Sequence, residues 1–340
     1  MAKLPTPQEL VASRPAFPAQ SWLDYKPKFA PGSFCYPAKV ETMEKLHMPH
    51  PHSWDPAAED WNLPEGWEKI FCDAFHDRLK KHRSLKVFMD ICVRCGACAD
   101  KCQFFLGTND PKNMPVLRVE LLRSLYRRDY TIGARKLDYS VIKELFYYAY
   151  QCTECRRCSL FCPYGIDTAE ITALVREMLH ELGLGIHWIM DPVKNCAFTG
   201  NHLGIKPHSY KEIVEMLADD CEYVTGIRPK TPFNERGHEI LFICPSGDVF
   251  ADPGIYTFMG YLMLFHELGL DYTLSTYASE GGNFGSFVSF NMAKKLNAKM
   301  YEEAERLGVK WILGGECGHM WRVVNQYMAT YNGPAPSNME

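Results

Sequence analysis

The chain has 340 residues and a formal net charge of −4, with 46% hydrophobic residues and 14 cysteines. The length predicts two domains, or one domain with appendages, and the hydrophobic content is enough for a sizeable core. The small net charge gives no indication of nucleic-acid binding. No uninterrupted apolar run reaches about 18 residues, so no membrane span is expected, and the first residues lack the apolar core of a signal peptide. We therefore expect a cytoplasmic protein, in which clustered cysteines indicate metal ligands rather than disulfides.

Residues 1–66 are expected to form an extended arm. They hold 11 of the 22 prolines, and proline blocks both helices and central strands. Three tryptophans, Trp22, Trp54 and Trp61, argue against plain disorder, which is poor in aromatic residues. We prefer an arm laid over this protein or a partner to a mobile tail. The histidines of residues 47–52 could attract a metal, but a solvated proline-rich turn is the preferred interpretation.

Residues 67–185 are expected to form a helical domain. The apolar periodicity predicts helices over residues 67–79, 119–126 and 140–150. The first of these helices leads into one cysteine-rich stretch, and the last leads into another.

A further helix is expected after Asp167, which forms a capping box with Glu170. Gly183 is the expected C-cap of this helix. The helix carries one apolar stripe, made of Ile171, Leu174, Val175, Met178 and Leu182. The stripe is ordinary core and indicates no chemistry.

Residues 186–237 are expected to connect this domain to the next without a clear element of their own. Cys196 and His202 lie in this segment with no ligand-like spacing. Structural roles are therefore expected for both.

From residue 238 the hydrophobic pattern changes to short apolar runs. Strands are predicted at residues 239–245, 271–277 and 309–315. A helix is predicted after each strand, over residues 255–268, 286–307 and 320–328. Strands that alternate with helices indicate a parallel α/β layer, so residues 238–340 are expected to form a small α/β domain.

Two cysteine sets share one spacing. The stretch "CVRCGACADKC" begins at Cys92 and "CTECRRCSLFC" begins at Cys152, and both read C-x2-C-x2-C-x3-C. Structural zinc is the alternative, but zinc sites usually pair two CxxC knuckles across a longer loop. Three cysteines at this tight spacing bind one cubane, and the fourth ligates the other cluster in two-cluster ferredoxins. The doubled pattern therefore predicts two [4Fe–4S] clusters.

The expected ligands follow from that crossed arrangement. The first cluster takes Cys92, Cys95, Cys98 and the distant Cys162. The second cluster takes Cys152, Cys155, Cys158 and the distant Cys102. Pro163 after Cys162 matches the bacterial pattern, whereas Gln103 follows Cys102. Two such clusters in series predict a path for electrons.

Arginines stand within both cysteine loops, at Arg94, Arg156 and Arg157. Positive charge beside a cluster raises its reduction potential, because reduction adds negative charge. Ordinary surface charge is an equal alternative, and the sequence leaves both open.

The predicted α/β domain carries two cysteines after its strands. Cys244 ends the first strand and Cys317 follows the third, while the glycine-rich stretch "SEGGNFG" follows the second. The carboxyl ends of parallel strands share one edge, where open α/β folds bind ligands. Buried structural thiols and a functional site both stay open for these cysteines. The glycines do not form GxGxxG, so no dinucleotide site is expected.

Two such cysteine sets in a helical frame, followed by this α/β domain, resemble the D subunits of heterodisulfide reductases. The stretches "GSFCYP", "FICPSGD" and "GGECGHMWR" carry the resemblance further, and the chain is most similar to the DsrK subunits of DsrMKJOP membrane complexes in dissimilatory sulfate and sulfite metabolism. The implied fold class is α+β or α/β. A helical ferredoxin domain with two clusters precedes a small CCG-type parallel-sheet domain, and a long extended arm precedes both.

The α/β domain of that family carries CCG motifs of the form C-xn-CCG-xn-C-x2-C. Cys244 stands at the first position of one such motif and Cys317 at the last. Residues 279–281 read Ser-Glu-Gly in place of Cys-Cys-Gly, and Gly314 replaces the penultimate cysteine. In the family, a later and complete motif holds an unusual catalytic [4Fe–4S] cluster. Family members continue well past the point equivalent to residue 340, so we expect a shortened chain, and a third cluster only where the complete motif is present.

The resemblance implies an iron–sulfur electron-transfer subunit held by its partners on the inner face of the cell membrane. The implied partners are a membrane cytochrome b subunit with its quinone pool and a small sulfur-carrier protein of the DsrC type. The implied chemistry is reduction of a disulfide or trisulfide, or its reverse, with Cys244 and Cys317 at the substrate end. This chain alone is expected to transfer electrons without substrate turnover. No role is assigned to Cys35, Cys72, Cys196 or Cys221.

Two alternatives stay open. One is the iron–sulfur subunit of a quinone-linked glycolate or lactate dehydrogenase, which has a similar architecture. The other is a zinc-stapled interaction protein without redox activity.

Overall fold

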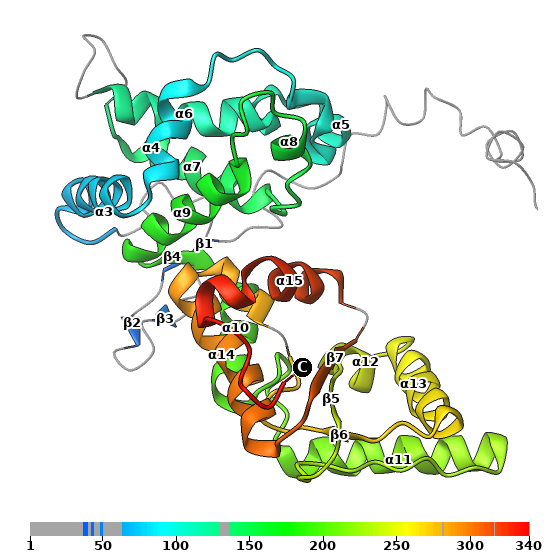
Figure 1. Cartoon of the computed structure of the whole chain (residues 1–340). Helices are drawn as coiled ribbons and strands as arrows, with labels where there is room; N and C mark the ends of the chain where they lie inside the picture. The colour runs from blue at the N-terminus through cyan, green and yellow to red at the C-terminus, as the bar shows by residue number, and fades with distance from the viewer. Residues whose placement is uncertain are drawn as a thin grey trace, which may run out of the picture. The chain divides into compact units, whose positions relative to one another are not determined.

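The computed structural model describes residues 63–128 and 136–340 apart from positions 281, 316 and 340, together with the backbone of three short strands before residue 50. All of these residues belong to one compact unit, Cys35–Glu340. The described part is mostly helical and contains one three-stranded parallel sheet (Figure 1). None of its helices combines the length and the hydropathy that a membrane crossing requires.

Seven helices precede the sheet region in the described residues up to Glu181. They are α3 (Trp67–Lys81), α4 (Arg83–Ile91), α5 (Gln103–Thr108), α6 (Pro115–Arg128), α7 (Tyr139–Gln151), α8 (Arg157–Leu160) and α9 (Thr168–Glu181). The three helices predicted from periodicity correspond to α3, α6 and α7, and each is longer than expected. The sequence analysis missed α4, whose nine residues lie between α3 and Cys92, the first cysteine of the first set.

Helix α9 lies at the centre of this helical part, and the apolar stripe predicted for it is buried. The side chain of Asp167 caps the helix by accepting hydrogen bonds from the backbone N–H groups of Ala169 at 2.9 Å and Glu170 at 3.3 Å. The expected capping box is only half formed, because the Glu170 side chain accepts a hydrogen bond from Ser84 instead. Gly183 follows the helix with a φ of 76°, as expected for a residue that ends a helix.

Part of the predicted arm is described as backbone. Strand β1 (Pro37–Lys39) pairs antiparallel with β4 (Leu184–Ile186), and Ala38 lies opposite Gly185. Strand β2 (Thr42–Met43) pairs with β3 (Met48–Pro49), and β3 contacts the helix that follows β4. The three arm tryptophans and the histidines of residues 47–52 lie outside the described residues, so the role of the arm stays a prediction.

The segment over residues 186–237 forms two helices that the sequence analysis did not expect. These are α10 (His187–Thr199) and α11 (Pro207–Thr225). Pro192 lies inside α10 and hid its helical pattern, since proline removes a backbone donor. Gly200 ends α10 with a φ of 82°, and a Cβ at this position would lie 2.4 Å from the carbonyl oxygen of Tyr277. Only glycine therefore fits this close approach between the helix end and the sheet region.

The predicted strands form the parallel sheet β6–β5–β7. Its members are β5 (Ile240–Ile243), β6 (Tyr272–Leu274) and β7 (Trp311–Gly314). The helices around it are α12 (Ser246–Phe250), α13 (Gly254–Leu268), α14 (Phe290–Leu307) and α15 (Gly318–Asn332). The helix predicted to start at Ser286 begins instead at Phe290, because residues 282–287 form a 3-10 turn, η3, and Ser289 caps α14.

Successive residues of β5 point to opposite faces of the sheet. Phe242 and Cys244 belong to an apolar cluster with α11 and α13, whereas Leu241 and Ile243 belong to a second cluster with α14 and α15. The strands are parallel, so their carboxyl ends meet at one edge, as predicted. The Gly315 N–H donates to the carbonyl oxygen of Ile243 at 2.8 Å across this edge.

Candidate metal centres

The two cysteine loops adopt the same backbone conformation. The residue two positions after the first cysteine is left-handed in both loops, with a φ of 56° at Arg94 and 53° at Glu154. The residue four positions after it is also left-handed, with a φ of 79° at Gly96 and 62° at Arg156. Turns of this kind direct backbone N–H groups into a concavity that suits anions, including iron–sulfur clusters. The repeated spacing in the sequence is therefore a repeated structure.

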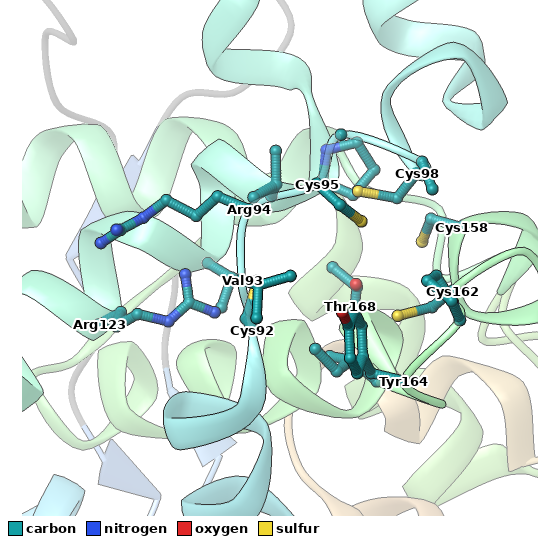
Figure 2. Close-up of a pocket in the computed structure, with 17 residues that line it drawn as sticks. Cys92, Val93, Arg94, Cys95, Cys98, Arg123, Cys158, Cys162, Tyr164 and Thr168 are labelled. Atoms are coloured by element: carbon teal, nitrogen blue, oxygen red, sulfur yellow. The ribbon is translucent and has the colours of Figure 1, made fainter.

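Four cysteines assigned to the first cluster line one pocket: Cys92, Cys95, Cys98 and Cys162. Cys162 is brought there from the end of the second set, as crossed ligation requires. Cys158 lines the same pocket, although the sequence analysis assigned it to the second cluster. Figure 2 shows the sulfur atoms of Cys95, Cys98, Cys158 and Cys162 directed toward a common space. Among the described residues, no three His, Cys, Asp or Glu side chains are placed as the ligands of a single metal ion.

The second set is organised around a buried arginine, Arg118 of α6. Its Nη2 group donates to the sulfur of Cys102 at 3.6 Å and to the side chain of Asn113 at 2.8 Å. The charge of Arg118 also acts on the thiol of Cys152. Arg118 thus lies near Cys102, the last cysteine of the first set, and Cys152, the first cysteine of the second set. Both are among the four expected ligands of the second cluster.

Burial dominates the electrostatics of the cysteine thiols. It raises the pKa of Cys98 and of Cys152, and it raises the pKa of Cys158 to about 11. The neighbouring thiols of Cys162 and Cys92 raise the pKa of Cys98 further. Thiolates in this environment need compensating positive charge, which a bound metal and the adjacent arginines can supply.

The buried arginines fit an anionic group between the cysteines. Arg123 of α6 lines the first pocket and is fully buried, and its Nη2 group has no hydrogen-bond partner among the described residues. The Nε group of Arg118, whose Nη2 group contacts Cys102, is likewise buried with no partner in the part of the chain that the structure describes. Unpaired buried donors are rare, and four soft thiol ligands are the donor set of a [4Fe–4S] cluster. The described residues therefore fit such a cluster at the first cysteine set, and the cluster at the second set stays a prediction.

The arginines that the sequence analysis singled out behave differently from these buried ones. Arg94 pairs with Glu120, its Nε group lying 2.9 Å from Oε2, and its guanidinium extends away from the cysteine sulfurs (Figure 2). Arg156 pairs with Asp167 at 2.9 Å. Carboxylates thus compensate both charges. The signal for the buried arginines was a charged residue inside an apolar helical run, as at Arg123 in "LLRSL" and Arg176 in "ALVREML".

The second set also faces the α/β region through α15. The exposed Cys155 lines a cavity of about 350 Å3 together with Gln103, Thr153 and the first turn of α15, which contributes Gly318, His319 and Arg322. Cys317, the predicted substrate-end cysteine, is the N-cap of the same helix and accepts a hydrogen bond from the Met320 N–H at 3.5 Å. Helix α15 therefore connects the second cysteine set with the carboxyl edge of the sheet.

Cys244 and Cys317 both lie at that edge but in different surroundings. Cys244 is buried in the apolar cluster on the α13 face, and its thiol donates to Asp248 at 3.6 Å. Cys317 packs against the cluster on the α14 face. The structure places both cysteines after their strands but on opposite faces of the sheet. Their catalytic role stays a prediction.

Ser279 and Glu280, which are expected to replace the two adjacent cysteines of the motif, belong to a buried polar cluster. Glu280 accepts a hydrogen bond from the Ser246 N–H at 2.9 Å, and its Oε1 lies 2.6 Å from Nδ1 of His202. The Ser279 hydroxyl donates to the carbonyl oxygen of Gly200 at 3.0 Å. These bonds join the end of α10, the β5 loop and the β6 loop, and the structural role of His202 stays a prediction.

The unassigned cysteines lie apart from the two sets where they are described. Cys196 and Cys221 are buried, and burial raises the pKa of both thiols. Cys72 is half-buried on α3. Cys35 lies outside the described residues.

The cysteine region and the chain as a whole both have relatives among known proteins. Residues 88–166 match the family model of the 4Fe-4S dicluster domain. The chain is 53% identical over 293 residues to a protein of Archaeoglobus profundus named Hdr-like menaquinol oxidoreductase iron-sulfur subunit, a match covering 82% of this chain and 53% of that protein. It is 54% identical over 288 residues to the Hdr-like menaquinol oxidoreductase iron-sulfur subunit 2 of Archaeoglobus fulgidus, covering 81% of this chain and 52% of that protein.

A weaker likeness extends to the family named by the sequence analysis. The chain is 28% identical over 103 residues to the D subunit of the dihydromethanophenazine:CoB--CoM heterodisulfide reductase of Methanosarcina barkeri, covering 28% of this chain and 25% of that protein. The chain spans about half the length of the two Archaeoglobus relatives. No solved structure matches it. These likenesses support iron–sulfur clusters and the resemblance to heterodisulfide reductases.

Proposed function

We propose that the chain is an iron–sulfur electron-transfer subunit of a membrane-associated oxidoreductase complex. One observation carries the proposal: Cys162, from the end of the second cysteine set, lines the pocket formed by Cys92, Cys95 and Cys98 of the first set. Two-cluster ferredoxins depend on this exchange between sets, in which the last cysteine of each set ligates the other cluster. The match of residues 88–166 to the 4Fe-4S dicluster domain supports the same conclusion.

The chain's own residues hold and tune the two proposed sites. The first site uses Cys92, Cys95, Cys98 and Cys162, with Arg123 beside it. The second site uses Cys152, Cys155, Cys158 and Cys102, with Arg118 and Arg176 beside it. When bound, each [4Fe–4S] cluster accepts and donates one electron at a time. The arginines balance the thiolate charge.

The two sites are proposed to face different partners. Large apolar side chains are exposed around the first site: Val93, Phe161 and Tyr164. Exposed apolar side chains next to a redox site suit contact with another protein. The second site instead faces α15 and the carboxyl edge of the sheet. We therefore assign the first site to the partner that exchanges electrons with the membrane, and the second site to the sulfur substrate.

The partners follow from the named relatives and from the family resemblance. The Archaeoglobus proteins are named as menaquinol oxidoreductase subunits, which supports a quinone-linked membrane cytochrome b partner on the first side. The heterodisulfide reductase likeness supports a disulfide or trisulfide substrate on the second side. The proposed substrate is a small sulfur-carrier protein of the DsrC type, as in the DsrMKJOP complexes of sulfur metabolism. The complex would hold this chain on the inner face of the cell membrane.

The described sheet edge supports electron transfer without substrate turnover. Ser279 and Glu280 occupy the central positions of the CCG-type motif and are engaged in buried hydrogen bonds. Cys244 and Cys317 lie on opposite faces of the sheet. We propose that a third, unusual [4Fe–4S] cluster and the disulfide chemistry require a complete CCG motif.

The test uses the 340-residue chain purified without oxygen. Dithionite should bleach its visible absorption, because both proposed clusters accept electrons. A disulfide-loaded carrier protein added to the reduced chain should release no thiol, measured with a thiol-reactive dye. A colourless protein that dithionite leaves unchanged would refute the electron-transfer function. Steady thiol release would refute the division of labour and would move the active site to Cys244 and Cys317.

A further inference from the structure

A buried carboxylate lies inside the second cysteine loop. Glu154 stands between Cys152 and Cys155, and its side chain is 7% exposed. Its left-handed backbone directs its N–H group to the sulfur of Cys152 at 3.3 Å. The corresponding position of the first loop holds Arg94, which is half-exposed. Because a buried charge is costly unless it is paired, the partners of Glu154 explain why it is there.

The first partner is Arg176, which comes from the centre of α9. Its Nη1 group donates to Oε1 of Glu154 at 2.6 Å, and its Nη2 group donates to the carbonyl oxygen of Ala149 at 2.9 Å. Nη2 also bonds the carbonyl oxygen of Cys152. Arg176 is 2% exposed, and its guanidinium lies over the ring of Tyr150 at 5.1 Å. The helical part of the chain therefore fixes one side of Glu154.

The second partner is Arg322, which comes from α15. Its Nη2 group lies 3.7 Å from Oε2 of Glu154, and its Nη1 group donates to the backbone carbonyl of Glu154. One helical turn further along α15, Gln326 accepts a hydrogen bond from Arg156 of the same cysteine loop at 3.0 Å. The Arg156 guanidinium lies over the ring of Tyr327 at 4.8 Å. One face of α15 is thus attached to the second cysteine loop.

We propose that Glu154 is a positioning residue that joins the second cysteine loop to α15 and sets the charge beside the second cluster. The inference rests on the proposed function, because it needs a redox group at Cys152, Cys155, Cys158 and Cys102. Glu154 holds Arg176 and Arg322 on either side of the loop. It fixes the distance between the second site and the helix whose N-cap is Cys317.

The proposal predicts opposite shifts of the reduction potential when Glu154 and Arg322 are each neutralised. Glu154→Gln keeps the size and most hydrogen-bonding capacity of the side chain but removes its negative charge, so the two arginines act uncompensated. Reduction adds negative charge, so the potential of the second cluster should rise. Arg322→Gln removes a positive charge, so the same potential should fall. A residue that served only to hold the fold would not produce shifts of opposite sign.

The experiment measures the potential of each cluster by redox titration followed by electron paramagnetic resonance, in the anaerobic 340-residue chain. We expect each variant to change the one-electron equilibrium of the second cluster at least tenfold, which corresponds to about 59 mV. The first cluster should stay at its wild-type potential. Glu181→Gln is the matched control, because Glu181 pairs with Arg78 at the far end of α9. This control should leave both potentials unchanged.

The outcomes separate the two proposals. A wild-type chain without clusters refutes the proposed function. Clusters that load normally, with unchanged potentials or shifts of one sign in both variants, refute the positioning role while the proposed function stands. If Glu154→Gln does not load its second cluster, Arg322→Gln alone decides: a lowered potential supports the proposal, and an unchanged one refutes it. Hydrogen exchange along α15 gives an independent readout, since both variants should speed exchange in this helix.

Discussion

Substitution of Arg123 tests whether buried positive charge balances the negative charge of the cysteine thiolates. The guanidinium is fully buried beside the first cysteine set. Its Nε group donates to the carbonyl oxygen of Met89 at 3.1 Å, and its Nη1 group donates to Oε2 of Glu120 at 2.6 Å. Its Nη2 group has no partner within the described part of the chain. Arg123→Met removes the charge and these bonds but keeps an unbranched apolar side chain that reaches as far as the position of Nε.

The expected loss of stability follows from those contacts. Two hydrogen bonds made by a charged group contribute about 1.5–3 kcal/mol each. Removing a buried donor that lacks a partner increases the free energy of unfolding by about 1–3 kcal/mol, because that donor no longer has to be desolvated. Glu120 keeps its bond to Arg94 and is not stranded. The cluster-free chain should therefore lose about 2.5 kcal/mol of its free energy of unfolding, the difference between about 4.5 kcal/mol for the two bonds and about 2 kcal/mol for the unpaired donor, each taken at the middle of its range.

The loaded chain should show a second effect that stability alone does not predict. Loss of positive charge beside the first cluster should lower its reduction potential, by at least the roughly 59 mV that corresponds to a tenfold change in a one-electron equilibrium. Denaturant unfolding measures the first effect, and redox titration followed by electron paramagnetic resonance measures the second. Arg78→Met is the control, because Arg78 pairs with Glu177 away from the cysteines. An unchanged potential of the first cluster in Arg123→Met would refute the charge-balancing role.

Three further predictions test separate parts of the structure. Cys162→Ser should disturb the cluster held by Cys92 and its neighbours, and spectra showing damage only to the other cluster would refute crossed ligation. Leu174→Ala should lower the free energy of unfolding by about 2–5 kcal/mol, because Leu174 is fully buried in the core of the helical part; a denaturant midpoint close to that of the wild type would contradict this packing. Burial opposes ionisation of Glu120, but hydrogen bonds from Arg94 and Arg123 lower its pKa overall. Glu120→Gln should therefore destabilise the protein at pH 7, and the difference from the wild type should shrink as the pH falls through the lowered pKa of Glu120; a pH-independent difference would show that the ion pairs are not its cause.

The sequence predicts the elements that carry a strong local signal. The three parallel strands lie within their predicted ranges, because short apolar runs followed by helices allow few other folds. The cysteine spacing likewise predicted that Cys162 would reach the first set. Neighbouring residues determine the strands, whereas the contact of Cys162 with the first set was predicted from the crossed ligation typical of two-cluster ferredoxins.

The missed features depend on contacts between distant parts of the chain. Helix α10 carries Pro192 in its interior, so its sequence pattern resembled a loop. Packing against the rest of the chain stabilises the helix despite the backbone hydrogen bond that proline cannot make. The roles of Arg118, Arg123 and Arg176 depend on which face of each helix meets the cysteines. Glu154 looked like one polar residue in a loop, and only the approach of Arg322 from 168 residues away makes it a junction. No local pattern contains that information.

The most direct test of the central claim is the content of iron and acid-labile sulfide in the anaerobically purified chain, measured together with zinc. Two [4Fe–4S] clusters predict about eight irons and about eight sulfides per chain, with negligible zinc. Zinc in place of iron would contradict the account. So would about four irons per chain, because each of the two sets of four cysteines is expected to hold its own cluster.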